Sequence, residues 1–219
     1  LAVAWATLCI AAMLAVGEGI RQGVLRTAQD GNGNLIYLTG GMATVDYGVF
    51  HQGKFLTLKA DDTDVIKALP EVKSAAPTAV WDERITVGDR GIWQKPLAVT
   101  TDFASMTNLI PMDGGRWLNP LDQKEMRKVV VLGYSLAADL FNPNEDFSWF
   151  APVTLQTNPV GEKVKIGTEE FTVIGVLKKN SAEVEQGDQI NYASFVPLAT
   201  WQRFYTNGDI GGINVEPQA

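Results

Sequence analysis

Residues 128–133 read Lys-Val-Val-Val-Leu-Gly, and residues 134–141 continue as Tyr-Ser-Leu-Ala-Ala-Asp-Leu-Phe. The run of three valines and a leucine suits a pleated strand better than any other stretch of the chain. Gly133 interrupts the run, and the eight residues after it suit a short helix. This order of strand, glycine and helix predicts a domain that mixes both kinds of element.

Apolar segments alternate with turn signals on the C-terminal side of this unit. The predicted elements there are strands over 161–166, 171–177, 190–196 and 213–215 and a short helix over 198–205. The first two strands are separated by Gly-Thr-Glu-Glu at 167–170, which predicts a hairpin. Pro197 ends the third strand, because proline cannot continue a ladder of backbone hydrogen bonds.

The N-terminal side shows the same alternation. The predicted elements there are strands over 35–39, 84–87 and 92–100 and short helices over 65–69 and 102–106. An acidic group at 61–64 suits the N-terminus of the first helix, and Pro70 closes that helix. Residues 40–53 and 111–120 predict loops, the second with Trp117 as an aromatic anchor. Together the segments predict an α+β fold of short, mostly antiparallel strands and short helices.

The composition sets outer limits on function. The chain has 219 residues, of which 46% are hydrophobic, and this is enough for a sizeable core. Its formal net charge of −7 disfavours nucleic acid and anionic lipid surfaces as partners. The single cysteine is Cys9, so the rest of the chain cannot form disulfides or a cysteine-type zinc site. Cysteine usage therefore leaves the compartment open.

The apolar run at residues 1–17 contains no charged residue. As a helix it would be about 25 Å long, close to the bilayer core of about 30 Å. We expect a transmembrane helix here; a secretory signal and a buried core helix are the alternatives. Arg21 and Arg26 argue weakly against an outside position for the side that follows. Residues 18–30 suit a helical stalk that ends at Gly31.

Residues typical of catalysis or metal binding are scarce. His51 is the one histidine, in a glycine-rich loop whose nearest acidic residue is Asp46, and a surface position is favoured over a catalytic one. Asp61, Asp62 and Asp64 lack the glycine turn of a calcium loop, so a helix-capping role is favoured. No phosphate-binding loop or serine-nucleophile motif is present. We therefore expect no catalytic residue, no cofactor, no metal site and no enzyme activity.

Aromatic residues offer the best candidate for a contact surface. The chain has six tryptophans, most of which we expect to pack in the core. Residues 142–159 contain three prolines and no clear periodicity, which predicts a long loop. Phe147, Trp149 and Phe150 cluster in this loop and are our candidate partner contact.

Several short segments, taken together in their order along the chain, indicate a protein family. They are LIYLTGG at 35–41, LPEV at 69–72, GGRW at 114–117, VVVLG at 129–133, FTVIGVL at 171–177 and VPL at 196–198. In this order and spacing they resemble the periplasmic core domain of MacB/FtsX-type ABC transporter permeases, with the first transmembrane helix attached. The resemblance covers nearly the whole chain.

The resemblance implies a permease of the cell (inner) membrane whose residues after about 20 are extracytoplasmic. Two copies, identical or different, would pair, and each would work with a cytoplasmic ATPase subunit or domain. The outer domain would relay ATP-driven motion to export or release a substrate, with a periplasmic adaptor or lipoprotein as a further partner. The family's outer domain carries no catalytic residue.

The resemblance also implies a division of the chain. Residues 1–30 would be the transmembrane helix and stalk, and residues 31–219 a two-lobed extracytoplasmic domain that is truncated at its C-terminal end. Lobe one would comprise 31–101 and 206–219, and the inserted lobe would comprise 102–205. The long segment at 142–159, which carries the aromatic cluster, departs from the family pattern.

Two other function classes remain open. A membrane-tethered sensor or ligand-binding module would be followed by a cytoplasmic signalling domain and would bind a small molecule. A secreted hydrolase would lose activity when His51 or an aspartate of the 61–64 group is replaced. A transport permease would instead show further transmembrane helices beyond residue 219.

Overall fold

The structure is a computed structural model. It describes residues 13–14, 17–19, 35–142, 154–179, 190–205 and 208–218. Residues 13–14 and 17–19 are helical. Within the described part of the chain, no helix combines the length and the hydropathy that a bilayer crossing requires. The predicted transmembrane helix and stalk at 1–30 fall mostly outside the described residues.

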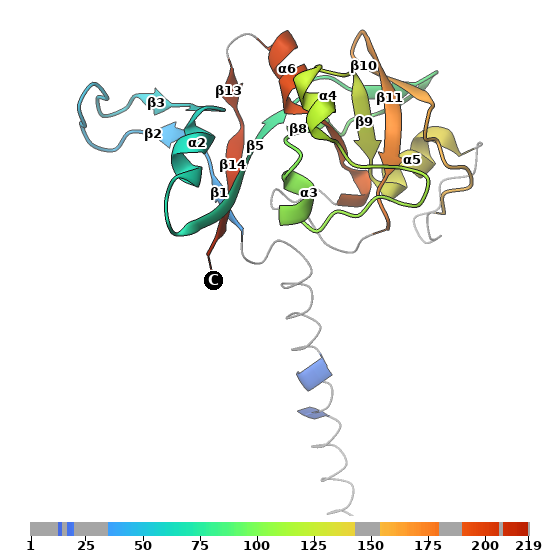
Figure 1. Cartoon of the computed structure of the whole chain (residues 1–219), viewed down its shortest axis with the longest axis horizontal. Coiled ribbons are helices and arrows are strands. Elements are labelled where there is room, and N and C mark those ends of the chain that lie inside the picture. The colour runs from blue at the N-terminus through green and yellow to red at the C-terminus, as the bar shows by residue number, and fades with distance from the viewer. Residues whose placement is uncertain are drawn as a thin grey trace, which may run out of the picture.

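A ten-stranded sheet forms the centre of the molecule (Figure 1). In spatial order its strands are β1 (Ile36–Leu38), β14 (Gly212–Pro217), β5 (Val72–Val80), β8 (Leu97–Val99), β12 (Ser194–Pro197), β9 (Val129–Leu132), β11 (Glu169–Val176), β10 (Lys163–Ile166), β6 (Ile85–Val87) and β7 (Arg90–Ile92). The β8–β12 and β9–β11 pairs are parallel, and the other described pairs are antiparallel. The predicted α+β class with mostly antiparallel strands is confirmed.

Strand β9 explains why residues 128–133 read as a continuous apolar run. Val130 and Leu132 belong to one buried cluster, and Val129 and Val131 belong to a second. Successive side chains of a strand point to opposite faces of the sheet. Both faces are therefore covered at β9, and a strand in that position has no solvent-facing side to mark with polar residues.

Short helices cover the two faces. Their bounds are α2 (Asp62–Lys67), α3 (Phe103–Met106), α4 (Pro120–Lys124), α5 (Tyr134–Phe141) and α6 (Leu198–Phe204), with a 3₁₀ turn η1 (Ile190–Tyr192). α5 and α6 place Leu136 and Trp201 in the first cluster. α3 places Phe103 in the second, 5.8 Å between ring centroids from Phe195 of β12. The predicted helix over 134–141 is confirmed.

Three local predictions were wrong. The strand predicted over 190–196 begins as the turn η1, and only Ser194–Pro197 is extended. Residues 40–53, predicted as a loop, contribute β2 (Gly41–Met42), which pairs with β3 (Phe55–Leu56). Helix α4 begins within residues 111–120, which were predicted as loop throughout.

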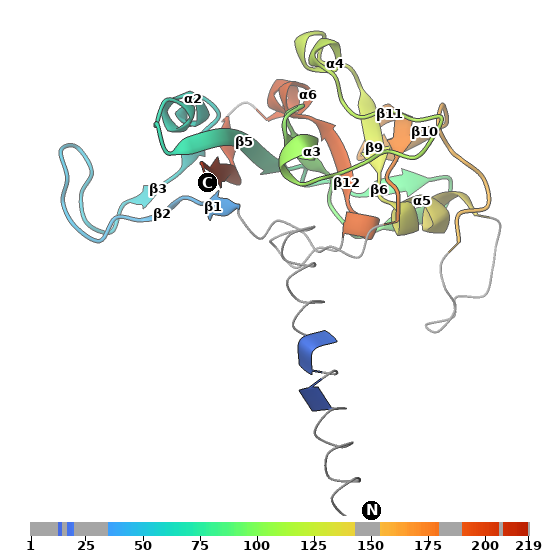
Figure 2. The same cartoon turned by 60° about the horizontal axis from the view of Figure 1, so that its bottom comes forward.

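Residues 41–56 form an arm that stands apart from the main sheet. Both views show this arm, which begins with β2 and β3 and ends in the loop between them, projecting away from the rest of the described chain (Figures 1 and 2). Next to its base, β4 (Leu58–Lys59) pairs with β13 (Asp209–Ile210). The Thr57 hydroxyl also donates a 3.1 Å hydrogen bond to Asp209 Oδ1. The arm is therefore fastened at its base to the strand that precedes β14.

The first and the last strand of the described sheet lie side by side. Ile36 pairs with Val215 and Leu38 pairs with Ile213, so the start of β1 and the end of β14 share one end of the sheet (Figure 2). β6 and β7 lie at the opposite edge of the same sheet, beside β10. One sheet contains strands from both predicted lobes, and the division into two lobes stays a prediction.

Candidate functional site

A cleft of about 610 Å³ separates helix α2 from α4, α6 and residues 100–102. Apolar residues such as Pro77 and Leu198 contribute to its lining. The charged residues of the lining are Asp61, Asp64, Asp102, Lys67 and Lys124. The cleft is thus mixed in character, with nearly balanced charge, and we call it the α2–α6 cleft.

The α2 wall is built by an acidic helix start. Asp62 and Asp64 occupy the first turn and Lys67 the last, which complements the helix dipole. The Asp62 carboxylate also accepts a 2.7 Å hydrogen bond from the backbone N–H of Lys59. Asp61 stands at the N-cap without a side-chain cap bond. The acidic group therefore complements the helix dipole, but the predicted capping bond is absent, and Asp62 instead binds the backbone that precedes the helix.

The opposite wall is held together by one glutamine. The Gln123 side chain donates to the carbonyl of Val99 at 2.7 Å and accepts from the backbone N–H of Ala199 at 3.1 Å. It thereby joins α4 to the end of β8 and to the first turn of α6. The Thr200 hydroxyl adds a 2.8 Å bond to the carbonyl of Arg127. α4, α6 and β8 form one bonded unit.

Helix α4 begins with a capping box. The Asn119 side chain accepts from the N–H of Asp122 at 2.9 Å, and the Asp122 carboxylate accepts from the N–H of Asn119 at 2.9 Å. Pro120 occupies the first turn, where its missing N–H costs nothing. This helix was not predicted, because it has five residues and no apolar period. The signal that could have found it is Asn-Pro followed by Asp122.

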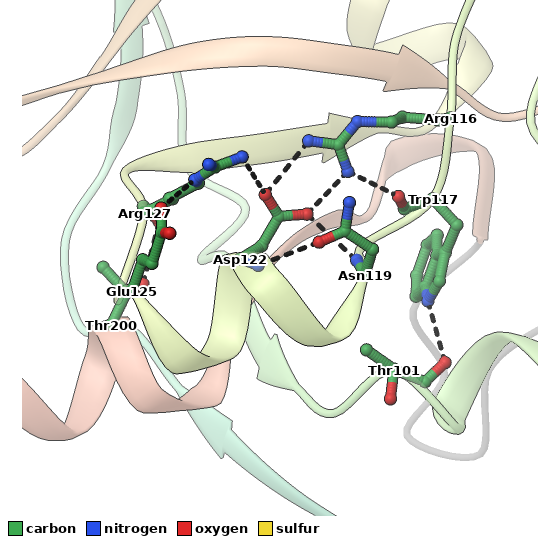
Figure 3. A network of polar contacts seen from close by, with 8 residues as sticks. All are labelled: Thr101, Arg116, Trp117, Asn119, Asp122, Glu125, Arg127 and Thr200. Carbon is green, nitrogen blue, oxygen red and sulfur yellow. Dashed lines mark hydrogen bonds and ion pairs between the residues drawn. The ribbon is translucent and has the colours of Figure 1, made fainter.

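Asp122 is fully buried and is the centre of the polar network in Figure 3. Arg116 binds it with both terminal nitrogens, at 2.6 and 3.0 Å, and Arg127 lies at 3.7 Å. Burial by itself raises the pKa of the Asp122 carboxyl. Hydrogen bonds from Arg116 and Asn119 and the charges of the two arginines outweigh burial, and the pKa falls below its ordinary value.

A close backbone contact positions Arg116. A methyl group added to Gly115 would lie 2.8 Å from the Cα of Gly175, and one added to Gly175 would lie 2.4 Å from the Arg116 carbonyl oxygen. The N–H of Arg116 donates to the carbonyl of Ile174 at 2.9 Å. Only glycine permits this approach. The two glycines thus bring the Arg116 side chain to Asp122, and through Asp122 they fix the α4 wall of the cleft.

A surface ion pair joins the two walls. Lys67 Nζ lies 3.6 Å from Asp102 Oδ2, and both side chains are substantially exposed. Such pairs contribute about 0–1 kcal/mol. Within the described residues, the buried hydroxyls of Thr63 and Thr100, which also line the cleft, have no hydrogen-bond partner. The side-chain contact across the cleft is therefore much weaker than the bonding within the α4–α6 wall, and the two walls are joined more firmly beneath the cleft, where β5 pairs with β8.

The other residues singled out in the sequence have different outcomes. Phe147, Trp149 and Phe150 lie outside the described residues, so their role stays a prediction. His51 is exposed in the arm, with Nδ1 3.6 Å from Asp46 Oδ1, and the predicted surface position is confirmed. In the described part of the chain, no group of three or more His, Cys, Asp or Glu residues is placed to hold a metal ion.

The tryptophans divide by environment. Trp81 and Trp201 are buried in the first cluster, which confirms their predicted packing role. Trp117 is partly buried against Phe195, with 5.3 Å between ring centroids. Trp93 is largely exposed and lies under the guanidinium of Arg84.

Comparison with known proteins identifies the family. The profile of the MacB-like periplasmic core domain matches residues 1–219. The chain belongs to this family. The resemblance carried by the short segments is therefore confirmed.

Curated relatives of this MacB-like chain are export proteins. The macrolide export ATP-binding/permease protein MacB of Chlorobium luteolum is 30% identical over 195 residues, which cover 87% of this chain and 26% of the relative. The pyoverdine export ATP-binding/permease protein PvdT of Pseudomonas aeruginosa is 26% identical over 182 residues, which cover 83% and 24%. The chain thus spans about a quarter of the length of the curated relatives it matches.

Solved structures share the fold of the MacB-like chain. The periplasmic region of MacB from Actinobacillus actinomycetemcomitans superposes with a TM-score of 0.63 at 19% identity, covering 90% of this chain and 80% of that one. The extracellular domain of the transporter YknZ from Gram-positive bacteria gives a TM-score of 0.63 at 17% identity, covering 85% and 84%.

Proposed function

We propose that this MacB-like chain is the extracytoplasmic domain of an ABC transporter permease subunit in the cell membrane. In this proposal the domain relays ATP-driven motion across the membrane to export or release a substrate. It is not itself an enzyme, and ATP is hydrolysed on a separate cytoplasmic domain or subunit. The names of the curated relatives, which are ATP-binding/permease proteins, support this assignment.

The pairing of the first strand of the sheet with the last one carries the proposal. Ile36 at the start of β1 pairs with Val215 near the end of β14. A domain inserted between two membrane helices must enter and leave on the same side, and this pairing supplies that geometry. A displacement of the helix before β1 against a helix after β14 would act directly on the β1–β14 edge of the sheet.

The motion would reach the α2–α6 cleft through β5. β14 and β5 are paired along nearly their whole length, and α2 packs against β5. The α4–α6 wall is bonded to β8 through Gln123. Because β5 also pairs with β8, and its Val80 carbonyl accepts a hydrogen bond from Trp201 of α6, a shift of β14 and β5 would move α2 relative to α4 and α6 by bending the sheet at the β5–β8 junction. The Lys67–Asp102 pair is a weak link that would permit the two walls to separate.

The proposal includes the partners that transport requires. Each permease copy would contact one ATPase domain or subunit and a second permease copy. The cluster of Phe147, Trp149 and Phe150 remains the candidate contact for a periplasmic adaptor or lipoprotein. We also propose that the two walls of the cleft belong to the two predicted lobes.

Distance measurements across the cleft test the relay. In the full-length permease with its ATPase and with Cys9→Ala, spin labels at Lys67→Cys and Gln202→Cys would report the separation of α2 from α6. We expect the distance distribution to change between the nucleotide-free and the ATP-trapped states. The matched control, Lys124→Cys with Gln202→Cys, places both labels on the bonded wall and should not change. An unchanged cleft distance during continued ATP hydrolysis would contradict the relay.

A further inference from the structure

The arm at residues 41–56 carries a concentration of exposed large hydrophobic side chains. Six large side chains stand out of contact with the core within fourteen residues. Their exposed fractions are Met42 67%, Val45 68%, Tyr47 81%, Val49 76%, Phe50 40% and Phe55 64%. A concentration of this kind on a soluble surface marks a site of interaction with another molecule.

Backbone hydrogen bonds between its two sides hold the arm in a hairpin conformation. Met42 pairs with Phe55, and the bridge between Tyr47 and Phe50 continues the same register to the tip. Tyr47 and Phe50 exchange two N–H···O bonds of 2.9 Å. Nearer the base, the N–H of Ala43 donates to the carbonyl of Lys54 at 2.9 Å. The apolar side chains are therefore presented on an ordered scaffold.

The base of the arm holds it away from the domain. A methyl group on Gly40 would lie 2.3 Å from the carbonyl oxygen of Leu56, so the two chain segments are in close backbone contact. The bond from Thr57 to Asp209 fixes the base on its other side. Both views show the arm extending outward from this base (Figures 1 and 2). The main sheet does not cover the tip.

The charge of the arm favours a second copy of this chain as its binding partner. The chain carries a net charge of −7, which opposes the association of two copies. The arm contains one aspartate, Asp46, and one lysine, Lys54, and its formal charge is zero. Two arms can therefore meet without the like-charge repulsion that opposes other contacts between copies. Their apolar tips would be buried by the same event.

We propose that the arm packs against the arm of a second copy of this chain across a two-fold axis. Such a contact uses the same patch on both partners, and a self-complementary surface needs no second binding site. The inference rests on the proposed function for the pairing of two permease copies. Confinement to one membrane raises the effective concentration of the second copy, so a contact of modest area suffices.

Site-directed crosslinking in membranes tests the contact. The full-length permease would carry Cys9→Ala and a single Tyr47→Cys or Val49→Cys, labelled with a maleimide-benzophenone reagent and then illuminated. The control is Val65→Cys, because Val65 is a similarly exposed apolar residue, 70% exposed, on helix α2. Two differently tagged copies would be co-expressed, so that pairing is measured separately by copurification.

We expect a species of twice the chain mass that carries both tags, several-fold more abundant at Tyr47→Cys and Val49→Cys than at Val65→Cys. Equal yields at the three positions would overturn the proposal. A tip crosslink to a protein of another mass, or to lipid alone, would assign the arm to that occupant instead and overturn it as well. Copurification without a tip crosslink would refute the arm contact and leave the permease function intact. Failure of the two copies to copurify would contradict both the pairing of two permease copies and the contact between their arms.

Discussion

The α4 wall and the arm are opposite exceptions to the usual distribution of polar and apolar residues. At the wall, the carboxylate of Asp122 is completely buried, and at the arm Tyr47 and Val49 are almost completely exposed. The buried charge is saturated by Arg116, Asn119 and Arg127 within the chain. Within the described residues, the side chains of Tyr47 and Val49 remain largely exposed to solvent. A buried charge that is paired within the chain therefore supports the fold, whereas a group of exposed apolar side chains indicates a surface that binds another molecule.

The largest expected effect is the loss of the buried carboxylate. Asp122→Ala removes the partner of Arg116 and half of the capping box, and we expect a loss of about 3 kcal/mol of unfolding free energy. Urea unfolding of the variant measures this. The matched control is Glu125→Ala, which also removes a carboxylate that binds Arg127 but is substantially exposed, and should cost less than about 1 kcal/mol. Equal losses would show that burial of Asp122 is not what stabilises the wall.

A smaller loss is expected from a methyl group placed at the glycine contact behind Arg116. In Gly175→Ala the added carbon would approach the Arg116 carbonyl oxygen to 2.4 Å, and backbone must move to admit it. Overpacking of this kind costs about 2 kcal/mol. Gly41→Ala, in the arm, is the control, because nothing lies within 4 Å of the added carbon. Thermal unfolding that lowers the melting temperature of both variants alike would contradict this difference between wall and arm.

The pH dependence of stability tests how much the ionised Asp122 carboxylate stabilises the wall. The pKa of Asp122 lies below its ordinary value of 3.8 in the folded chain and at about that value in the unfolded chain. Between these two values the unfolded chain binds more protons, so the stabilisation present above about pH 4 is lost as the pH falls further. Urea unfolding across this range should show a flatter profile for Asp122→Asn than for the parent chain. Parallel profiles would mean that the carboxylate gains nothing from its arginines.

Local signals in the sequence predicted the elements whose stability is decided locally. Residues 129–132 form a strand because β-branched side chains favour it, and Gly133 then separates that strand from α5. The turn η1 was predicted as strand because an apolar run does not distinguish a strand from a buried 3₁₀ turn. The hairpin in the arm was missed because few of its residues alternate regularly, and its register depends on backbone bonds.

The sites depended on contacts that no local pattern contains. Asp122 and Arg116 are near in sequence, but their approach requires Gly175, which belongs to a strand far along the chain. The α2–α6 cleft joins residues near position 65 to residues near 200, and their proximity follows from the order of strands in the sheet. The predicted aromatic cluster at 147–150 lies outside the described residues and stays a prediction.

The smallest expected effect is at the tip of the arm. Tyr47→Ser and Val49→Ser remove side chains that are 81% and 76% exposed, so the unfolding free energy of the single chain should change by less than about 0.5 kcal/mol. Thermal unfolding measures this, with Trp201→Ser, which opens the buried cluster, as the contrasting variant. A marked loss of stability from the tip variants would show that the tip packs within its own chain. Unchanged stability, together with loss of the crosslink between copies, would separate the arm's role from the wall's, because the arm would then be dispensable for folding and required for contact.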